Sequence, residues 1–191
     1  ETEWLSRHEG PAAGGLEYPS VPDTNYEQVR FDMEAPVRIW GLKVMLYVQD
    51  PGPVTVYLWD DFGGNFFNLN HWEPLAQVTR EVTSEDNGVW LEFPFEEPVD
   101  LDPGRMFYAG VIVTGERGTR LMIDGEVDPP GEGKDSASSL VWFSTVPPDE
   151  GGFPAIANPS GDFMVEAEID KFLDEFKSAL QLTEQTVRAA G

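Results

Sequence analysis

Apolar and polar residues alternate through most of the middle of this chain, the pattern of β-strands that bury one face. In residues 36–50, Leu42, Val44, Leu46 and Val48 recur at every second position, with polar or bulkier residues between them. The same spacing recurs in further segments of similar length: 26–32, 52–61, 73–83, 89–95, 105–115, 118–125, 139–145 and 162–169. The pattern predicts a series of antiparallel strands.

Glycine and proline separate these segments and predict tight connections between them. The chain has 19 glycines and 16 prolines, many of them between the predicted strands, where they favour turns. Gly41 lies inside its segment and is expected at a bulge. The prolines of residues 96–104 cannot donate to a central ladder, so an edge strand or a loop is expected there. Residues 118–125 are expected to pair with 105–115 through a turn at 116–118. Together these features predict an all-β fold, an antiparallel β-sandwich.

The two ends of the chain depart from this pattern. Residues 1–25 are rich in proline, glycine and charge, which predicts an irregular N-terminal lead-in packed across the body. From Asp170 onward the apolar spacing changes from 2 to 3.6, which predicts an amphipathic C-terminal helix over residues 171–191, with Asp170 as its N-cap. The sandwich domain is accordingly expected over residues 26–170. The helix either packs on the sandwich or leads to a neighbouring domain or protomer.

The charge of the chain limits its partners. The formal net charge is -23, from 35 acidic and 12 basic residues. Such a surface repels nucleic acids and anionic bilayers, which leaves cations, cationic partners and neutral sugars. A saline habitat would also account for the acidity.

Cysteine and long apolar stretches are both missing from the sequence. The chain contains no cysteine, which excludes disulfides, thiolate zinc sites and a cysteine nucleophile. No apolar run reaches the length that spans a membrane. Because the chain begins at Glu1 without a methionine, a processed protein is expected.

Motifs of known enzyme classes are also missing. The sequence has no GxSxG elbow, HExxH helix, P-loop or GxGxxG turn between a strand and a helix. It has only two histidines, His8 and His71. The chain is therefore predicted not to be an enzyme. A hydrolase whose carboxylates converge only in three dimensions is a weaker alternative.

The segment 60–72, DDFGGNFFNLNHW, concentrates side chains that can bind ligands. Carboxylates, amides and loop glycines are what hard cations such as Ca²⁺ require. A calcium site is therefore predicted at Asp60, Asp61, Asn65 and Asn68, although a solvated turn accounts for the same residues. A second acidic cluster, Asp124, Glu126 and Asp128, predicts either another cation site or a soluble loop.

Aromatic residues around the same segment predict a recognition surface. Rings that stack on sugar C–H faces beside amides and carboxylates are how neutral sugars are bound. The candidate ligand-binding residues are Trp59, Phe66, Phe67, Asn70, His71 and Trp72. Alternatively, aromatic side chains such as Trp59 fill a second layer of the core.

Four stretches resemble a known class of bacterial module: 36–64, which ends in WDDFGG; 74–83, PLAQVTREVT; 88–115, GVWLEFPFEEPVDLDPGRMFYAGVIVTG; and 161–169, GDFMVEAEI. They are similar to jelly-roll-like sandwiches appended to secreted peptidases, glycosidases and surface proteins. The resemblance covers about residues 26–170. It implies a carbohydrate-binding or galactose-binding-like module.

These observations favour a non-catalytic module, secreted or in the cell envelope, that recognises a polysaccharide or a protein surface, with calcium stabilising the 60–72 loop. The alternative is a structural subunit of a surface assembly, which docks on its neighbours or on further copies of itself through the N-terminal arm and the C-terminal helix. No nucleic acid and no membrane insertion is expected in either case.

Overall fold

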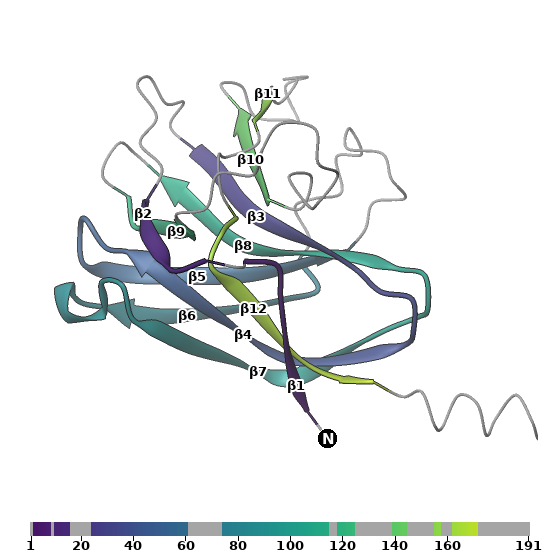
Figure 1. Ribbon diagram of the computed structural model, residues 1–191. Helices are drawn as coiled ribbons and strands as arrows, with labels where there is room; N and C mark the ends of the chain where they lie inside the picture. Colours follow the sequence, from purple (N-terminus) through teal and green to yellow (C-terminus); the bar gives the residue numbers. More distant parts are fainter. Residues whose placement is uncertain are drawn as a thin grey trace, which may run out of the picture.

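The chain folds into two antiparallel β-sheets that face each other, as the computed structural model shows (Figure 1). The structure describes residues 2–8, 10–15, 24–60, 74–114, 118–124, 139–144, 155–157 and 162–171. The predicted all-β sandwich is confirmed. The predicted C-terminal helix lies outside the described residues, apart from Lys171, which belongs to a strand.

The first sheet has β4 near its middle, with β7 on one side of it and β12 and β9 on the other. Its strands are β1 (Glu3–Ser6), β2 (Ala12–Gly15), β4 (Val37–Tyr47), β7 (Trp90–Leu101), β9 (Arg120–Asp124) and β12 (Val165–Lys171).

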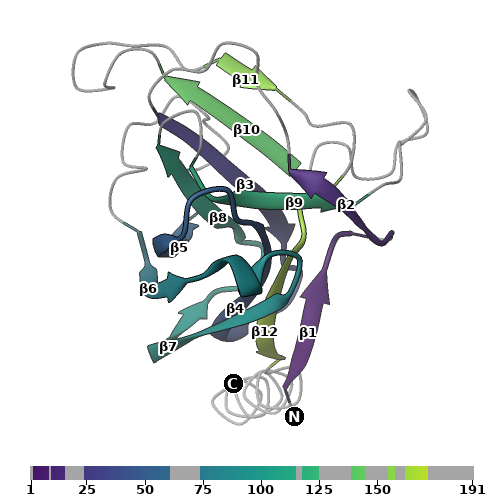
Figure 2. The same ribbon diagram turned by 90° about the vertical axis from the view of Figure 1, so that its left-hand side faces the viewer.

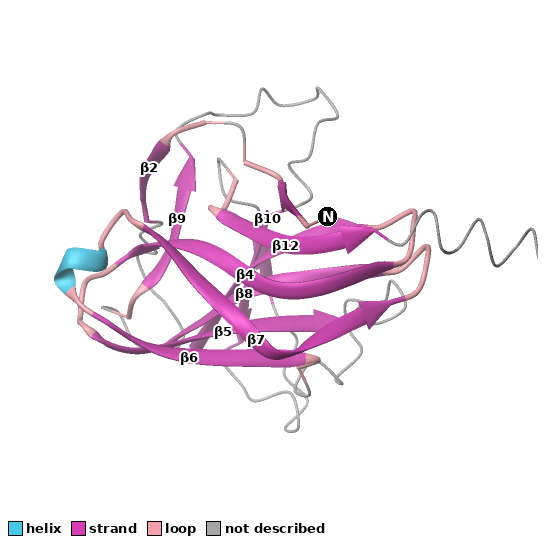
Figure 3. Ribbon diagram, turned by 90° about the horizontal axis from the view of Figure 1, so that it is seen from below, coloured by secondary structure: helices cyan, strands magenta, loops and turns pink. Residues whose placement is uncertain are grey.

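The second sheet has the strand order β11-β10-β3-β8-β5-β6. Its strands are β3 (Thr24–Asp32), β5 (Gly52–Asp60), β6 (Ala76–Val82), β8 (Met106–Thr114), β10 (Ser139–Ser144) and β11 (Ala155–Ala157). A single 3-10 turn, Ser84–Asp86, links β6 to β7 at one end of the sandwich (Figure 3).

The core lies between the sheets and is built from the residues that the alternation predicted. Leu42, Val44 and Leu46 of β4 have no exposed surface. From the opposite sheet, Phe31 and Phe107 stack with ring centroids 4.9 Å apart. Further members from both sheets have at most 1% exposure: Val29, Ile39, Val56, Leu58, Phe93, Ala109, Val111, Val113, Val165, Ala167 and Ile169.

The N-terminal residues form an edge of the first sheet, whereas the sequence predicted an irregular lead-in. β1 pairs with β12 and β2 pairs with β9, and both partners pair with the same side of β4 (Figure 2). We call residues 2–15 the N-terminal arm. A segment poor in β-forming residues becomes a strand here because β12 and β9 leave an edge of unpaired backbone groups that the arm satisfies.

Two further predictions differ from the structure. Residues 120–124, expected to pair with 105–115, form β9 and pair with β4 and β2 of the first sheet. Asp170, predicted as a helix N-cap, lies in β12 opposite Arg38. In both cases the short-range pattern was compatible with the prediction, and pairing with distant β4 decided the outcome.

The bulge predicted at Gly41 is confirmed. The pairing of β4 with β12 passes from Ile39 directly to Gly41 opposite consecutive residues of β12, which leaves Trp40 as the extra residue. Opposite β7 the same step also skips residues 95–98, so the ladder is more irregular on that side. A Cβ on Gly41 would lie 2.8 Å from the Phe93 carbonyl oxygen, so only glycine fits against β7.

A carboxyl group is buried in the interior at Glu27. This side chain has no exposed surface, and its Oε2 accepts a 2.7 Å hydrogen bond from the Leu121 amide. Burial raises the pKa of Glu27 from its ordinary 4.5 to about 8, although the Leu121 amide and the charge of Arg120 act in the opposite direction. The carboxyl group is therefore largely protonated at neutral pH.

We predict that Gly110→Ala strongly destabilises the fold. A Cβ on Gly110 would clash with the backbone oxygen of Glu27 and lie 2.7 Å from the Gln28 Cα. Backbone on the paired strand β3 cannot move aside cheaply, so a loss of about 3 kcal/mol in the free energy of unfolding is expected. Urea denaturation measures this loss. Exposed Glu96→Ala on β7 is the control, and equal stability of the two variants would contradict the close approach of β3 and β8.

We also predict that Glu27 makes the protein less stable as the pH rises. Its folded-state pKa lies above the unfolded value, so below about pH 4.5 both states are protonated and stability does not change with pH through this group. Between about pH 4.5 and pH 8 the unfolded chain ionises first, and the free energy of unfolding falls by up to about 1.4 kcal/mol per pH unit.

The Glu27→Gln variant, which retains a carbonyl oxygen for the Leu121 amide, should show a smaller fall than the unchanged protein in urea melts at pH values across that range. In the control variant Glu96→Gln, at an exposed position, the free energy of unfolding should fall with pH as much as in the unchanged protein. The same slope in all three proteins would show that Glu27 does not titrate as proposed.

Candidate functional site

Three tryptophans lie on the outer face of the first sheet, on three different elements. Trp4 comes from β1, Trp40 from the bulge of β4 and Trp90 from the start of β7. Trp4 is 39% exposed and Trp40 is 37% exposed, and Trp90 is half-buried. Together with Lys43 and Glu166, these residues form what we call the tryptophan face.

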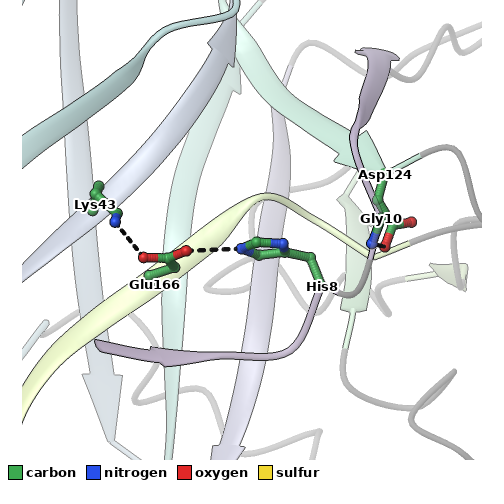
Figure 4. A network of polar contacts seen from close by, with 5 residues as sticks. All are labelled: His8, Gly10, Lys43, Asp124 and Glu166. Carbon is green, nitrogen blue, oxygen red and sulfur yellow. Dashed lines mark hydrogen bonds and ion pairs between the residues drawn. The ribbon is translucent and has the colours of Figure 1, made fainter. Parts of the chain in front are cut away.

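An ion-pair network occupies the centre of this face (Figure 4). The Lys43 Nζ lies 2.5 Å from Glu166 Oε2, and His8 Nε2 lies 3.0 Å from Glu166 Oε1. All three side chains are 13–19% exposed. Because both oxygens of one carboxylate are engaged, Glu166 of β12 connects β4 to the N-terminal arm.

The Lys43 ammonium group also lies over two of the indole rings. Its Nζ is 4.4 Å from the centroid of Trp4 and 4.9 Å from that of Trp90. The His8 ring completes the cluster, with its centroid 5.2 Å from that of Trp90. Cation–π attraction and the ion pair therefore act on the same ammonium group.

The remainder of the arm is held through Asp124. Its Oδ2 accepts a 3.3 Å hydrogen bond from the Gly10 amide (Figure 4), and its Oδ1 accepts one of 3.0 Å from the Asp162 amide. Asp124 is only 4% exposed. The sequence analysis predicted either a cation site or a soluble loop for the 124–128 cluster. It did not predict that Asp124 accepts hydrogen bonds from backbone amides of two distant segments.

The third tryptophan has its own cation. The Arg38 guanidinium lies 5.8 Å from the Trp40 centroid and donates to both oxygens of Asp100, at 2.7 and 2.8 Å. These hydrogen bonds lower the pKa of Asp100. A bidentate ion pair thus holds Arg38 over the ring of an exposed indole.

Trp59, predicted to bind ligand, lies on the outer face of the second sheet and is 2% exposed. It packs against Tyr26 and Tyr108 and stacks on Tyr57 with ring centroids 5.1 Å apart. Burial raises the pKa of the Tyr26 hydroxyl to about 12. This placement matches the second-layer alternative for Trp59, and a ligand would need the cluster to open.

Asp60, predicted to bind calcium, forms an ion pair with Arg105 through both carboxylate oxygens. A cation there would compete with the guanidinium. Among the described residues, no group of three or more histidines and carboxylates is arranged to hold a metal ion. The other predicted site residues lie outside the described part of the chain: Asp61, Asn65, Phe66, Phe67, Asn68, Asn70, His71 and Trp72. For these residues the ligand and calcium sites remain predictions.

Sequence reasoning did not find the tryptophan face. Lys43 and Glu166 were each placed opposite the core by alternation, but 123 positions separate them and no local signal joins them. Trp4 and His8 were assigned to an irregular segment. The one available signal was that Lys43 and Trp90 fall opposite the apolar residues of their predicted strands. Strict alternation would place Trp40 on the same face as Leu42, and only the bulge turns it outward.

Comparison of the sequence with known protein families and with curated proteins gives no match. Within the described part of the chain, no helix has the length and apolar character needed to cross a bilayer. The chemistry of the tryptophan face therefore has to be judged from its own geometry: it offers ring surfaces and carboxylate acceptors, held on a rigid sheet.

We predict that Glu166→Gln loosens the N-terminal arm without unfolding the sandwich. Both contacts of Glu166, to Lys43 and to His8, are strengthened by the negative charge of the carboxylate, so removing that charge weakens them. Amide hydrogen exchange at the β1 amides that bond to β12 should become about tenfold faster, the effect of losing about 1.4 kcal/mol of local stability. Glu92→Gln, on the same face but on β7, is the matched control. Unchanged exchange in Glu166→Gln would contradict the role of this carboxylate.

Proposed function

We propose that this protein is a non-catalytic binding module, secreted or in the cell envelope, and that it recognises a polysaccharide through the tryptophan face. The observation that supports the proposal best is the pair of exposed indoles, Trp4 and Trp40, on a sheet face with carboxylates beside them. Exposed apolar side chains that gather on one face of a protein often mark a binding surface.

The arrangement suits an extended ligand. In register across four strands, Trp4, Glu168, Gly41 and Pro94 form one row. Gly41 contributes no side chain to this row, which leaves a flat stretch between Glu168 and Pro94. Sugar rings stack on such apolar surfaces while carboxylate oxygens accept hydrogen bonds from hydroxyl groups.

Two further features predicted from the sequence belong to this proposal. The module would be jelly-roll-like, and the 60–72 loop, with or without calcium, would be a second recognition element. The alternative is a structural subunit that docks through its N-terminal arm and its C-terminal helix. It has less support, because the described arm pairs with β12 and β9 of its own chain.

We predict that the tryptophans of this face carry the affinity. Affinity electrophoresis in gels containing soluble polysaccharides would measure retardation of the protein. Trp4→Ala and Trp40→Ala should each weaken binding by about tenfold, since a stacked ring is worth about 1–2 kcal/mol.

Leu75→Ala is the matched control. Leu75 is 40% exposed, close to the exposure of both indoles, but it precedes β6 in the other sheet. Thermal melts would show that each variant is folded. If the tryptophan variants bind as tightly as the control, the tryptophan face is not the binding surface.

A further inference from the structure

We infer that the tryptophan face selects an uncharged polysaccharide and rejects both anionic and cationic ones. The inference rests on the proposed function and deepens it by naming the ligand class. It depends on how the charges of this face are already used within the protein.

The face carries more acid than base. Its outward-facing carboxylates come from β7 and β12, and its two cations from β4. The carboxylates include Glu92, Glu96, Asp100, Glu166, Glu168 and Asp170, and the cations are Arg38 and Lys43. Acids therefore outnumber bases on this face, and the whole chain has the same sign, with a net charge of -23. An anionic polymer would therefore be repelled at contact and at longer range.

Both cations that could attract an anion are engaged by carboxylates. Lys43 lies 2.5 Å from Glu166, and Arg38 makes two hydrogen bonds to Asp100. A sulfated or uronic acid polymer could reach either cation only by displacing an internal partner that is itself an anion. Such an exchange gains no net charge pairing, so it cannot offset the repulsion.

A cationic polymer is disfavoured for a different reason. Ammonium groups bind to aromatic rings by cation–π attraction, but Lys43 already lies over the rings of Trp4 and Trp90, and Arg38 over that of Trp40. The sites at which a ligand cation would be recognised specifically are thus occupied by the protein's own side chains. What these cations leave open is the exposed remainder of Trp4 and Trp40, which suits uncharged C–H surfaces.

Hydrogen bonding at the face points the same way. Glu92 and Glu168 form no ion pair among the described residues, and the exposed Ser6 lies in the same cross-strand row as Glu166, Lys43 and Glu92. Carboxylates without a cation accept hydrogen bonds readily from hydroxyl groups. Hydroxyl groups are the polar groups that a neutral polysaccharide offers in abundance.

The test is calorimetric titration of the whole chain with soluble polymers of three charge classes. The neutral ones are a mixed-linkage β-glucan, a galactomannan and an arabinoxylan; the anionic ones are alginate and polygalacturonate; the cationic one is chitosan. We expect at least one neutral polymer to bind, with an affinity that changes less than about twofold between 0.15 M and 1 M NaCl because no charge pairing is involved. Trp4→Ala and Trp40→Ala should weaken that binding about tenfold. Alginate and polygalacturonate should not bind.

A pair of charge variants distinguishes hydrogen bonding by Glu168 from the effect of the protein's overall charge. Glu168→Gln should weaken neutral binding by about fivefold, because an amide oxygen is a poorer acceptor than a carboxylate. Glu81→Gln, exposed on β6 of the other sheet, removes the same charge and should have no effect. Chitosan adsorption, if seen, should be lost at 1 M NaCl and be equal in all variants, as expected for adsorption to an acidic protein.

Each of the other results has a distinct meaning. Binding of an anionic polymer that the tryptophan variants lose would overturn the inferred ligand class but retain the proposed function. Salt-resistant chitosan binding that depends on Trp4 or Trp40 would do the same. Failure of every polymer to bind the unchanged protein would overturn both.

Discussion

The pairing of β12 with β4 is the interaction on which the rest of this structure depends. It joins the last described strand to the centre of the first sheet and buries Val165, Ala167 and Ile169 completely. Because the side chains of a strand alternate, the same register turns Glu166 outward beside Lys43. It also exposes the other edge of β12, to which β1 adds. The buried residues of β12, the Lys43–Glu166 ion pair and the position of the arm therefore all depend on the pairing of β12 with β4.

The arm shows how a sheet edge can be protected and used at once. An unpaired edge is a template for association with other chains, and here residues 2–15 cover it along β12 and β9. The same segment brings Trp4 and His8 onto the outer face, where they meet residues from β4, β7 and β12. The tryptophan face is therefore complete only when the arm is docked.

The two carboxylates Glu27 and Glu166 show what the surroundings do to the same chemical group. Glu27 lies in the interior with one amide donor and a raised pKa. Glu166 lies at the surface between Lys43 and His8. Desolvation raises the pKa of Glu27, whereas Glu166 is in contact with side chains from two other segments. Consequently Glu27 favours folding at low pH, whereas Glu166 joins the elements that form the candidate site.

The sequence by itself determined the fold class and the contents of the core, since period-two alternation assigns each strand residue to one face whatever its partners are. It also located the bulge at Gly41. It did not predict that the arm forms a sheet edge, that residues 120–124 belong to the first sheet, or that Lys43, Glu166 and His8 lie in contact. Those outcomes depend on which strands pair, and pairing depends on the total burial and backbone hydrogen bonding of the folded chain. A strand's own residues therefore say which side chains will face outward, but only the tertiary structure decides which of them meet.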